Sequence, residues 1–177
     1  MKFRTSIILI GLLEGLLLAG CSGGKEPVPD NTAGLYQIEY RPGYGDMAGA
    51  YHYERLSKDD KGEWIIESYD RDIFSDPIEI TTYAVSQEAV NEFAAFLSEK
   101  DVISLSTRKE SKDFVTDYTP FSISIWYEKK PGEKNWDSYQ IEEYRVYSDD
   151  DYALLKEFTE KFHSLRGRKL SVRQQEN

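Results

Sequence analysis

The sequence predicts an α+β fold: an antiparallel sheet of five or six strands with two helices packed on one face. Two periodicities lead to this prediction. Apolar residues alternate with polar ones in several short segments, as in half-buried strands, and in two other segments they recur every three or four residues, as in amphipathic helices. Both halves of the chain have the order of a hairpin followed by a helix.

Alternation and turn residues define the strands. The predicted strands are residues 35–40, 51–56, 64–69, 78–83, 121–127 and 139–147. Polar stretches with Gly or Pro separate several of them, at residues 41–46, 57–62 and 130–133. A further short extended piece is expected at residues 102–105, before an irregular polar segment at 106–119. In the last strand the apolar phase slips between Ile141 and Tyr144, which indicates a bulge or a change of face.

Each predicted helix begins at a serine. Ser86 is a candidate N-cap with Glu88 in the first turn, and Ser148 with Asp151 three residues later resembles a capping box. Behind each cap the apolar residues share one helical face. These residues are Val90, Phe93, Ala94 and Leu97 in the first helix, and Leu155, Phe158, Phe162 and Leu165 in the second.

The first 21 residues have the pattern of an export signal. A basic start (Lys2 and Arg4) is followed by an apolar run at residues 7–18 and two small residues, Ala19 and Gly20. The run is shorter than the roughly 20 apolar residues of a membrane-spanning helix, and Glu14 interrupts it. A cleaved signal peptide is therefore predicted over residues 1–20.

The sequence Leu18-Ala19-Gly20-Cys21 resembles the lipobox of bacterial lipoproteins. This resemblance implies that the Cys21 thiol is joined to diacylglycerol and that the chain is cut before Cys21. The mature protein would then be anchored to the cell membrane by lipid on the extracytoplasmic side. Ser22 in place of aspartate after the cysteine implies the outer membrane in a host with two membranes. The order of elements is also similar to that of small extracytoplasmic lipoproteins without assigned activity.

The remaining chain divides into three parts. Residues 21–33 form the lipidated cysteine and a flexible tether, residues 34–166 a single α+β domain, and residues 167–177 a basic tail that is expected to be disordered. Cys21 is the only cysteine, so no intrachain disulfide can form and the apolar core must supply the stability.

Charge argues against one class of function. The chain has a formal net charge of −10, and removal of the signal, with Lys2, Arg4 and Glu14, leaves −11. Such a surface repels nucleic acid, so no nucleic-acid partner is expected.

Motifs for catalysis, metals or cofactors are absent from the sequence. It has no phosphate-binding loop, no Cys/His metal spacing and no nucleophile motif, so no catalytic, metal or cofactor residues are predicted. The two histidines, His52 and His163, are assigned structural or solvent-facing roles. The acidic run at residues 149–151 is assigned to the start of the second helix and not to a calcium loop.

Aromatic residues suggest where a partner would bind. The chain has 13 tyrosines, and Tyr40, Tyr44, Tyr51 and Tyr53 flank or lie in a Gly-containing loop that is the candidate binding loop. The leading hypothesis is a membrane-anchored lipoprotein with a non-catalytic binding or accessory role in the cell envelope, its partner an envelope protein or glycan. One alternative is an enzyme that acts on envelope glycan or peptide through carboxylates. The other is an inhibitor or scaffold that docks by a sheet edge or by the aromatic loop.

Overall fold

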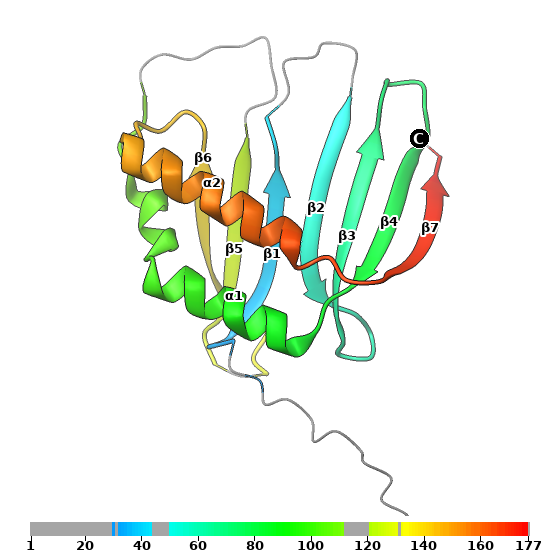
Figure 1. Cartoon of the computed structure of the whole chain (residues 1–177), viewed down its shortest axis with the longest axis horizontal. Coiled ribbons are helices and arrows are strands. Elements are labelled where there is room, and N and C mark those ends of the chain that lie inside the picture. Colours follow the sequence, from blue (N-terminus) through cyan, green and yellow to red (C-terminus); the bar gives the residue numbers. More distant parts are fainter. Residues whose placement is uncertain (1–29, 31, 44–49, 112–120, 131, 177) are drawn as a thin grey trace, which may run out of the picture.

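The computed structural model describes residues 30, 32–43, 50–111, 121–130 and 132–176. These residues form one antiparallel seven-stranded sheet in the order β6-β5-β1-β2-β3-β4-β7, with two α-helices on one side (Figure 1). The strands are β1 (Leu35–Arg41), β2 (Tyr51–Lys58), β3 (Trp64–Arg71), β4 (Ile78–Ala84), β5 (Ser122–Glu128), β6 (Trp136–Glu142) and β7 (Lys169–Gln175). The helices are α1 (Gln87–Glu99), the 3-10 helix η1 (Val102–Thr107) and α2 (Asp149–Ser164). The α+β prediction is confirmed.

The two helices begin where the sequence predicts. The Ser86 hydroxyl accepts a hydrogen bond from the amide of Ala89, which caps α1. At the start of α2 the Ser148 and Asp151 side chains each accept from the other residue's amide, so the capping box is complete. Asp151 also pairs with Arg108 at 2.8 Å, which ties the first turn of α2 to the segment after η1.

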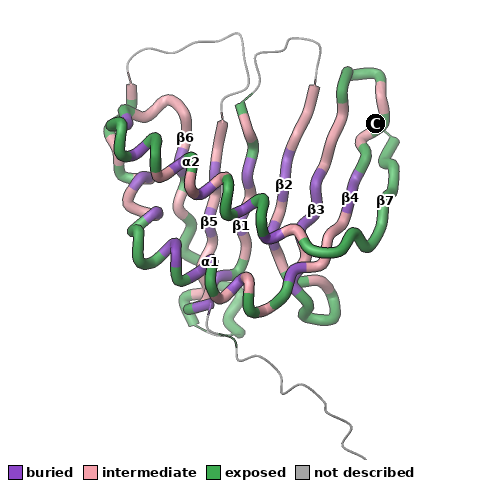
Figure 2. The backbone as a smooth tube through the Cα atoms, viewed as in Figure 1, coloured by how far each residue is buried: buried purple, intermediate pink, exposed green. Residues whose placement is uncertain are grey.

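The core lies between the helices and one face of the sheet, which we call the helix face. Ile38 on β1 pairs with Leu56 on β2 and Ile125 on β5, and all three side chains are fully buried. From the helices, Phe158 and Phe162 stack on each other at 5.8 Å and contact Phe93 of α1. Figure 2 shows that buried positions alternate along these strands, as the sequence pattern predicts.

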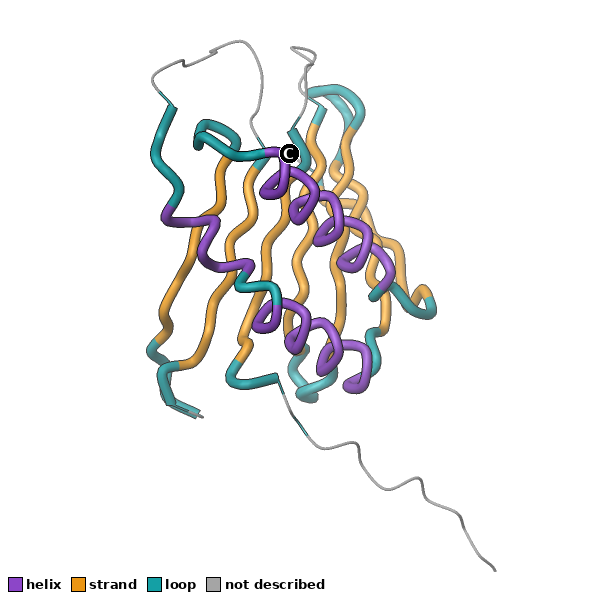
Figure 3. The backbone as a smooth tube through the Cα atoms, turned by 60° about the vertical axis from the view of Figure 1, so that its left-hand side comes forward, coloured by secondary structure: helices purple, strands orange, loops and turns teal. Residues whose placement is uncertain are grey.

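The helices cover only part of the helix face. They lie over β6, β5 and β1 and end beside β2, so β4 and β7 are uncovered on this side (Figures 1 and 3). The register places Ser68 of β3 opposite Thr81 of β4, and Asp70 opposite Glu79. The helix face is therefore apolar where the helices cover it and mainly polar on β3 and β4 where they do not, while Val172 of β7, opposite Thr81, adds an exposed apolar side chain.

The seventh strand corrects the prediction for the C-terminal tail. Residues 169–175 were expected to be disordered, but β7 pairs with β4 along its whole length. The Gly167 amide donates to the Ala84 carbonyl at 3.0 Å, and a Cβ at Gly167 would lie 2.6 Å from that oxygen, so only glycine allows this approach. Every side chain of β7 is exposed. Because the strand is held mainly by main-chain bonds and buries no apolar side chain, the alternation of apolar residues in the sequence does not reveal it.

Two other boundaries differ from the predictions. Residues 102–105 belong to the 3-10 helix η1 and are not extended, with Val102 and Leu105 buried in the core. The last predicted strand, residues 139–147, ends at Glu142, where the Arg145 amide donates to the Glu142 carbonyl and closes a turn. The phase slip after Ile141 thus marks the end of a strand.

Asp30 and Thr32, which the sequence assigned to the tether, contact the domain. Asp30 pairs with Lys58 at 2.9 Å and Thr32 is buried. The signal peptide and Cys21 lie outside the described residues. Within the described ranges, none of the helices has the length and apolar character needed to cross a membrane.

Candidate functional site

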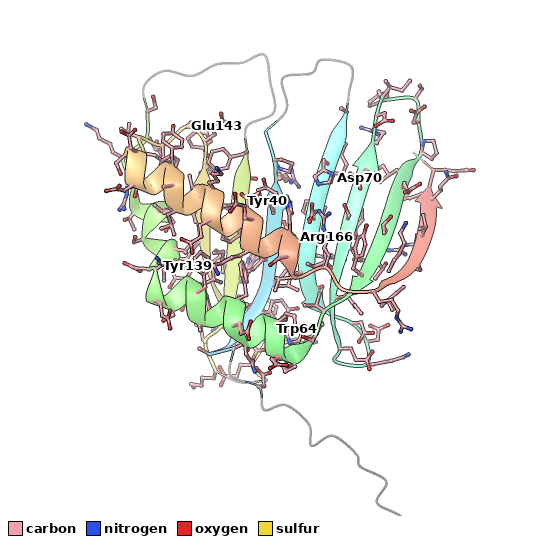
Figure 4. The ribbon with its side chains drawn as sticks, viewed as in Figure 1. Tyr40, Trp64, Asp70, Tyr139, Glu143 and Arg166 are labelled. Atoms are coloured by element: carbon pink, nitrogen blue, oxygen red, sulfur yellow. The ribbon has the colours of Figure 1, made fainter. Side chains whose placement is uncertain are left out.

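A buried ionic network lies where the helix face becomes polar. Its centre is Glu54 on β2, whose side chain has no exposed surface. Three cationic or titratable groups meet its Oε1 atom: Arg166 forms an ion pair with it, His52 Nε2 lies 2.8 Å away and His163 Nε2 3.5 Å away. In Figure 4 Arg166 lies just beyond the end of α2, beside β2, and Asp70 lies farther along β3. The network therefore joins the C-terminus of α2 to the middle of the sheet.

The geometry of His52 does not suit nucleophilic catalysis. Its Nδ1 bonds to Asp70 and its Nε2 to Glu54, so both ring nitrogens face carboxylates. Ser68 donates its hydroxyl hydrogen to Asp70 Oδ2 at 2.8 Å. In a serine hydrolase the imidazole lies between the serine and the carboxylate and removes the serine's proton. Here the carboxylate lies between serine and imidazole, so Ser68 is not activated.

The electrostatics keep the network ionised. Burial by itself lowers the pKa of His52, but hydrogen bonds to Asp70 and Glu54 outweigh it and raise the pKa to about 9. Burial by itself raises the pKa of Glu54, whereas the hydrogen bond from His52 and the charge of Arg166 bring it below its ordinary value. The His163 pKa is lowered by burial, which Glu54 offsets only in part. His52 is thus a cation at neutral pH.

The charge on His52 makes the stability of the domain fall at alkaline pH. Its pKa is about 6.5 when unfolded and about 9 when folded. Because the folded state binds the proton more tightly, this stabilisation is complete below pH 6.5 and is lost as the pH rises through 9. We expect the free energy of unfolding, measured with urea, to fall by about 3 kcal/mol between pH 6.5 and pH 9.5.

Substitution of each histidine separates this effect from other titrations. The His52→Gln variant should lose most of the pH dependence. The His163→Gln variant should keep it, because burial shifts the pKa of His163 downward, so this group cannot be the source of stabilisation that is lost on the alkaline side. An equal alkaline loss in wild type and His52→Gln would show that another group is responsible.

The opposite side of the sheet, which we call the open face, carries arginines on tyrosine rings. No described element covers it (Figure 3). Arg41 lies over the Tyr53 ring at 5.1 Å, Arg55 over Tyr69 at 6.0 Å and Arg71 over Tyr51 at 5.9 Å. These distances are within the range of cation–π contacts, which favour a guanidinium group near the face of a tyrosine ring. These guanidinium groups give the open face donors that suit carboxylate and phosphate groups better than sugar rings.

A second ionic cluster lies on the open face, around Glu67 of β3. Arg55 donates to Glu67 Oε2 at 2.5 Å and Arg173 of β7 donates to Oε1 at 2.9 Å, while the Tyr69 hydroxyl donates to Oε2. Burial by itself raises the pKa of Glu67, but the hydrogen bonds from Arg55 and Tyr69 bring it below its ordinary value. Two arginines share one carboxylate, so the cluster retains a positive charge.

The tyrosines of the predicted binding loop do not lie on one surface. Tyr40 is on the helix face, 7% exposed and packed edge-on against Phe162. Tyr51 and Tyr53 lie on the open face with their rings 6.3 Å apart, and Tyr53 is also buried. Tyr44 lies outside the described residues. Binding by the loop itself stays a prediction, but Tyr40 and Tyr53 would contribute little accessible area.

The sequence did not single out the arginines. Alternation along β2 and β3 places Tyr53 and Arg55, or Tyr69 and Arg71, two residues apart on one face. Listing the residues on the polar face of each predicted strand would have shown that arginines and tyrosines neighbour each other there. The convergence of His52, Glu54 and His163 had no such signal, because it depends on how the end of α2 meets β2.

The described carboxyl groups show no candidate general acid. A glycoside hydrolase needs a carboxylic acid with a raised pKa. Within the described residues, every carboxyl group whose pKa departs from its ordinary value is shifted downward, namely Asp30, Glu54, Glu67, Asp70 and Asp151. The described part of the chain also has no group of three or more His, Cys, Asp or Glu side chains able to hold a metal ion.

Comparison with known proteins identifies no relative of the chain. No protein-family model, no curated protein and no solved structure matches the chain.

Proposed function

We propose that the protein is a lipid-anchored accessory protein of the cell envelope that binds a partner and catalyses no reaction. The observation that carries the binding role is the open face, on which arginines lie over Tyr51, Tyr53 and Tyr69 with no described layer above them. Arginine and tyrosine are enriched in the energetically important parts of protein interfaces. The lipobox at residues 18–21 supports the anchor.

A non-catalytic role is supported by the state of the ionisable groups. His52 is protonated and bonded to two carboxylates, so it is not free to accept a proton from a substrate. The shifted carboxyl groups in the described residues all have lowered pKa values, which favours charge pairing over proton donation. The enzyme alternative therefore has less support than binding.

Replacement of Cys21 tests the anchor. A diacylglyceryl group supplies two acyl chains, which hold a protein stably at a membrane, whereas one chain binds only marginally. We expect Cys21→Ala to abolish labelling by a palmitate analogue and to move the protein from the membrane fraction to the soluble fraction. The measurement is fractionation of the native host with the full chain.

The neighbouring Ser22→Ala change is the matched control and should keep both label and membrane fraction. A Cys21→Ala protein that stays labelled and membrane-bound would refute the anchor.

A further inference from the structure

We propose that the outer edge of β7 binds an extended acidic segment of a partner protein, which adds to the sheet as an eighth strand. This inference rests on the proposed binding role and names its mode and the chemistry of its partner. β7 (Lys169–Gln175) ends the sheet on the β4 side, and no described element lies beyond it (Figure 1). Its seven residues are all exposed. An edge strand of this kind presents unpaired amide and carbonyl groups that can pair with another strand.

The backbone of β7 is regular enough to act as a template. It pairs with β4 from Ile78 to Thr82 without interruption, and its one register shift lies at its beginning, between Thr82 and Tyr83. No proline occurs in the strand. Its length, about 23 Å at 3.3 Å per residue, matches that of an ordinary strand.

Charge selects the partner. Arg168, Lys169 and Arg173 lie on or beside β7 and are exposed, in a chain whose net charge is −10. The acidic side chains nearby are Glu67 and Asp70 on β3, Glu79 on β4 and Glu176 directly after β7. Glu67 is already shared between Arg173 and Arg55, and Asp70 is bonded to His52. The edge thus keeps a local positive excess, which favours glutamate and aspartate on an added strand.

The same charge opposes pairing between two copies of the chain. Two β7 edges brought together would place like charges beside each other, a device by which proteins block edge-to-edge association. The opposite edge, β6, carries Asp137 and Glu142 and lacks a basic residue within its seven positions. Both carboxylates are paired, Asp137 with Lys129 and Glu142 with Arg145, so β6 offers an acidic segment no attraction comparable to that of β7.

The side chains of β7 can contact the added strand on both sides of the sheet. Leu170 and Val172 are about half exposed, at 46% and 48%, and supply apolar contact area. Arg173 lies next to the open face through its bond to Glu67. A segment that alternates acidic and β-branched residues fits this pattern.

A peptide-binding experiment tests the proposal on the full-length protein in zwitterionic detergent. The probe is a fluorescent peptide in which glutamate alternates with valine. The first comparison peptide has lysine for glutamate, and the second is the acidic peptide with every second amide N-methylated on its pairing edge. We expect the acidic peptide to bind with an affinity that falls with salt, and both comparison peptides to bind at least about tenfold more weakly.

Charge reversal locates the site. The triple change Arg168→Glu, Lys169→Glu and Arg173→Glu should lower the affinity at least about tenfold. The matched control is Lys61→Glu, Lys134→Glu and Lys156→Glu, which changes the net charge equally at exposed sites elsewhere and should leave the affinity within about twofold. Hydrogen exchange should show slower exchange of β7 amides in the presence of the acidic peptide.

Three outcomes would overturn the proposal: no binding of the acidic peptide, equal binding of the N-methylated peptide, or preferential binding of phosphatidylglycerol vesicles. Equal binding of the N-methylated peptide would mean attraction by charge without strand addition, and vesicle binding would make β7 a membrane contact. The peptide comparison uses the wild-type chain, so a misfolded variant cannot mask the result. None of these results depends on the Cys21 anchor, which has its own fractionation test.

Discussion

Replacing Phe162 with alanine is expected to destabilise the domain by about 4 kcal/mol. Phe162 lies in the last turn of α2, is fully buried and contacts Tyr40, Phe93 and Phe158 with ring centroids 5.8–6.0 Å apart. Removal of the ring loses the free energy of its burial and leaves a cavity between α2, α1 and β1. Because close-packed side chains surround this cavity on three sides, the structure cannot collapse to fill it. Urea unfolding should show a lower midpoint with an unchanged slope.

Lys156→Ala on the same helix is the control. Lys156 is exposed and alanine is at least as favourable as lysine in a helix, so the free energy of unfolding should change by less than about 0.5 kcal/mol. Domains of this size are stable by about 5–15 kcal/mol, so the Phe162→Ala protein should remain folded but marginal at 37 °C. A loss below about 1 kcal/mol would mean that α2 does not pack on the sheet as described.

Replacing Arg166 with alanine is expected to cost about 3 kcal/mol in the free energy of unfolding. Arg166 and His52 together neutralise Glu54, which has no exposed surface. Without Arg166, the carboxylate keeps the charged His52 but loses its partner from the end of α2, and a buried charge with too few partners is costly. Urea unfolding at pH 7 gives the difference directly.

Arg168→Ala provides the matched control, since Arg168 lies two residues away and is exposed, and this change should cost less than about 0.5 kcal/mol. The double variant Arg166→Ala with Glu54→Gln should recover part of the loss, because the glutamine carries no charge to bury. If the two changes were additive, Arg166 would act through packing and not through Glu54.

Most of the fold could be predicted from the sequence because its elements depend on local patterns. The strand at residues 121–127 alternates so regularly that one face had to be buried, and Ile123 and Ile125 are fully buried. Ser86 and Ser148 specify helix starts by their own side-chain bonds to the first turn. These signals act within a few residues and are present in the chain before it folds.

The wrong predictions for residues 169–175 and 102–105 share a physical cause. β7 is held mainly by main-chain bonds to β4, which any residue except proline can make, and its side-chain bond from Arg173 to Glu67 joins residues 106 positions apart, so the local sequence carries little trace of the pairing. Residues 102–105 form η1 because the chain must turn after α1 to bury Val102 and Leu105, and a short apolar run fits either a strand or a helix.

The candidate site depended almost entirely on tertiary structure. Glu54 and Arg166 are 112 positions apart in the chain, and nothing near Glu54 in the sequence predicts a buried carboxylate. Likewise, Arg173 and Glu67 meet only because β4 lies between β3 and β7 with a register that brings their side chains to the same face.

By itself the sequence determined the α+β class, the two capped helices and the apolar half of the sheet, since periodicity and caps are local properties. The resemblance of residues 18–21 to a lipobox predicts an anchor at Cys21, and this stays a prediction. Only the tertiary structure decided that the C-terminal residues form an exposed basic edge strand, that arginines lie over tyrosine rings on the open face, and that two histidines meet one buried glutamate. Each of these arrangements depends on strand register and on where α2 ends. Pairing between segments distant in the chain sets both, and no local pattern in the sequence encodes them.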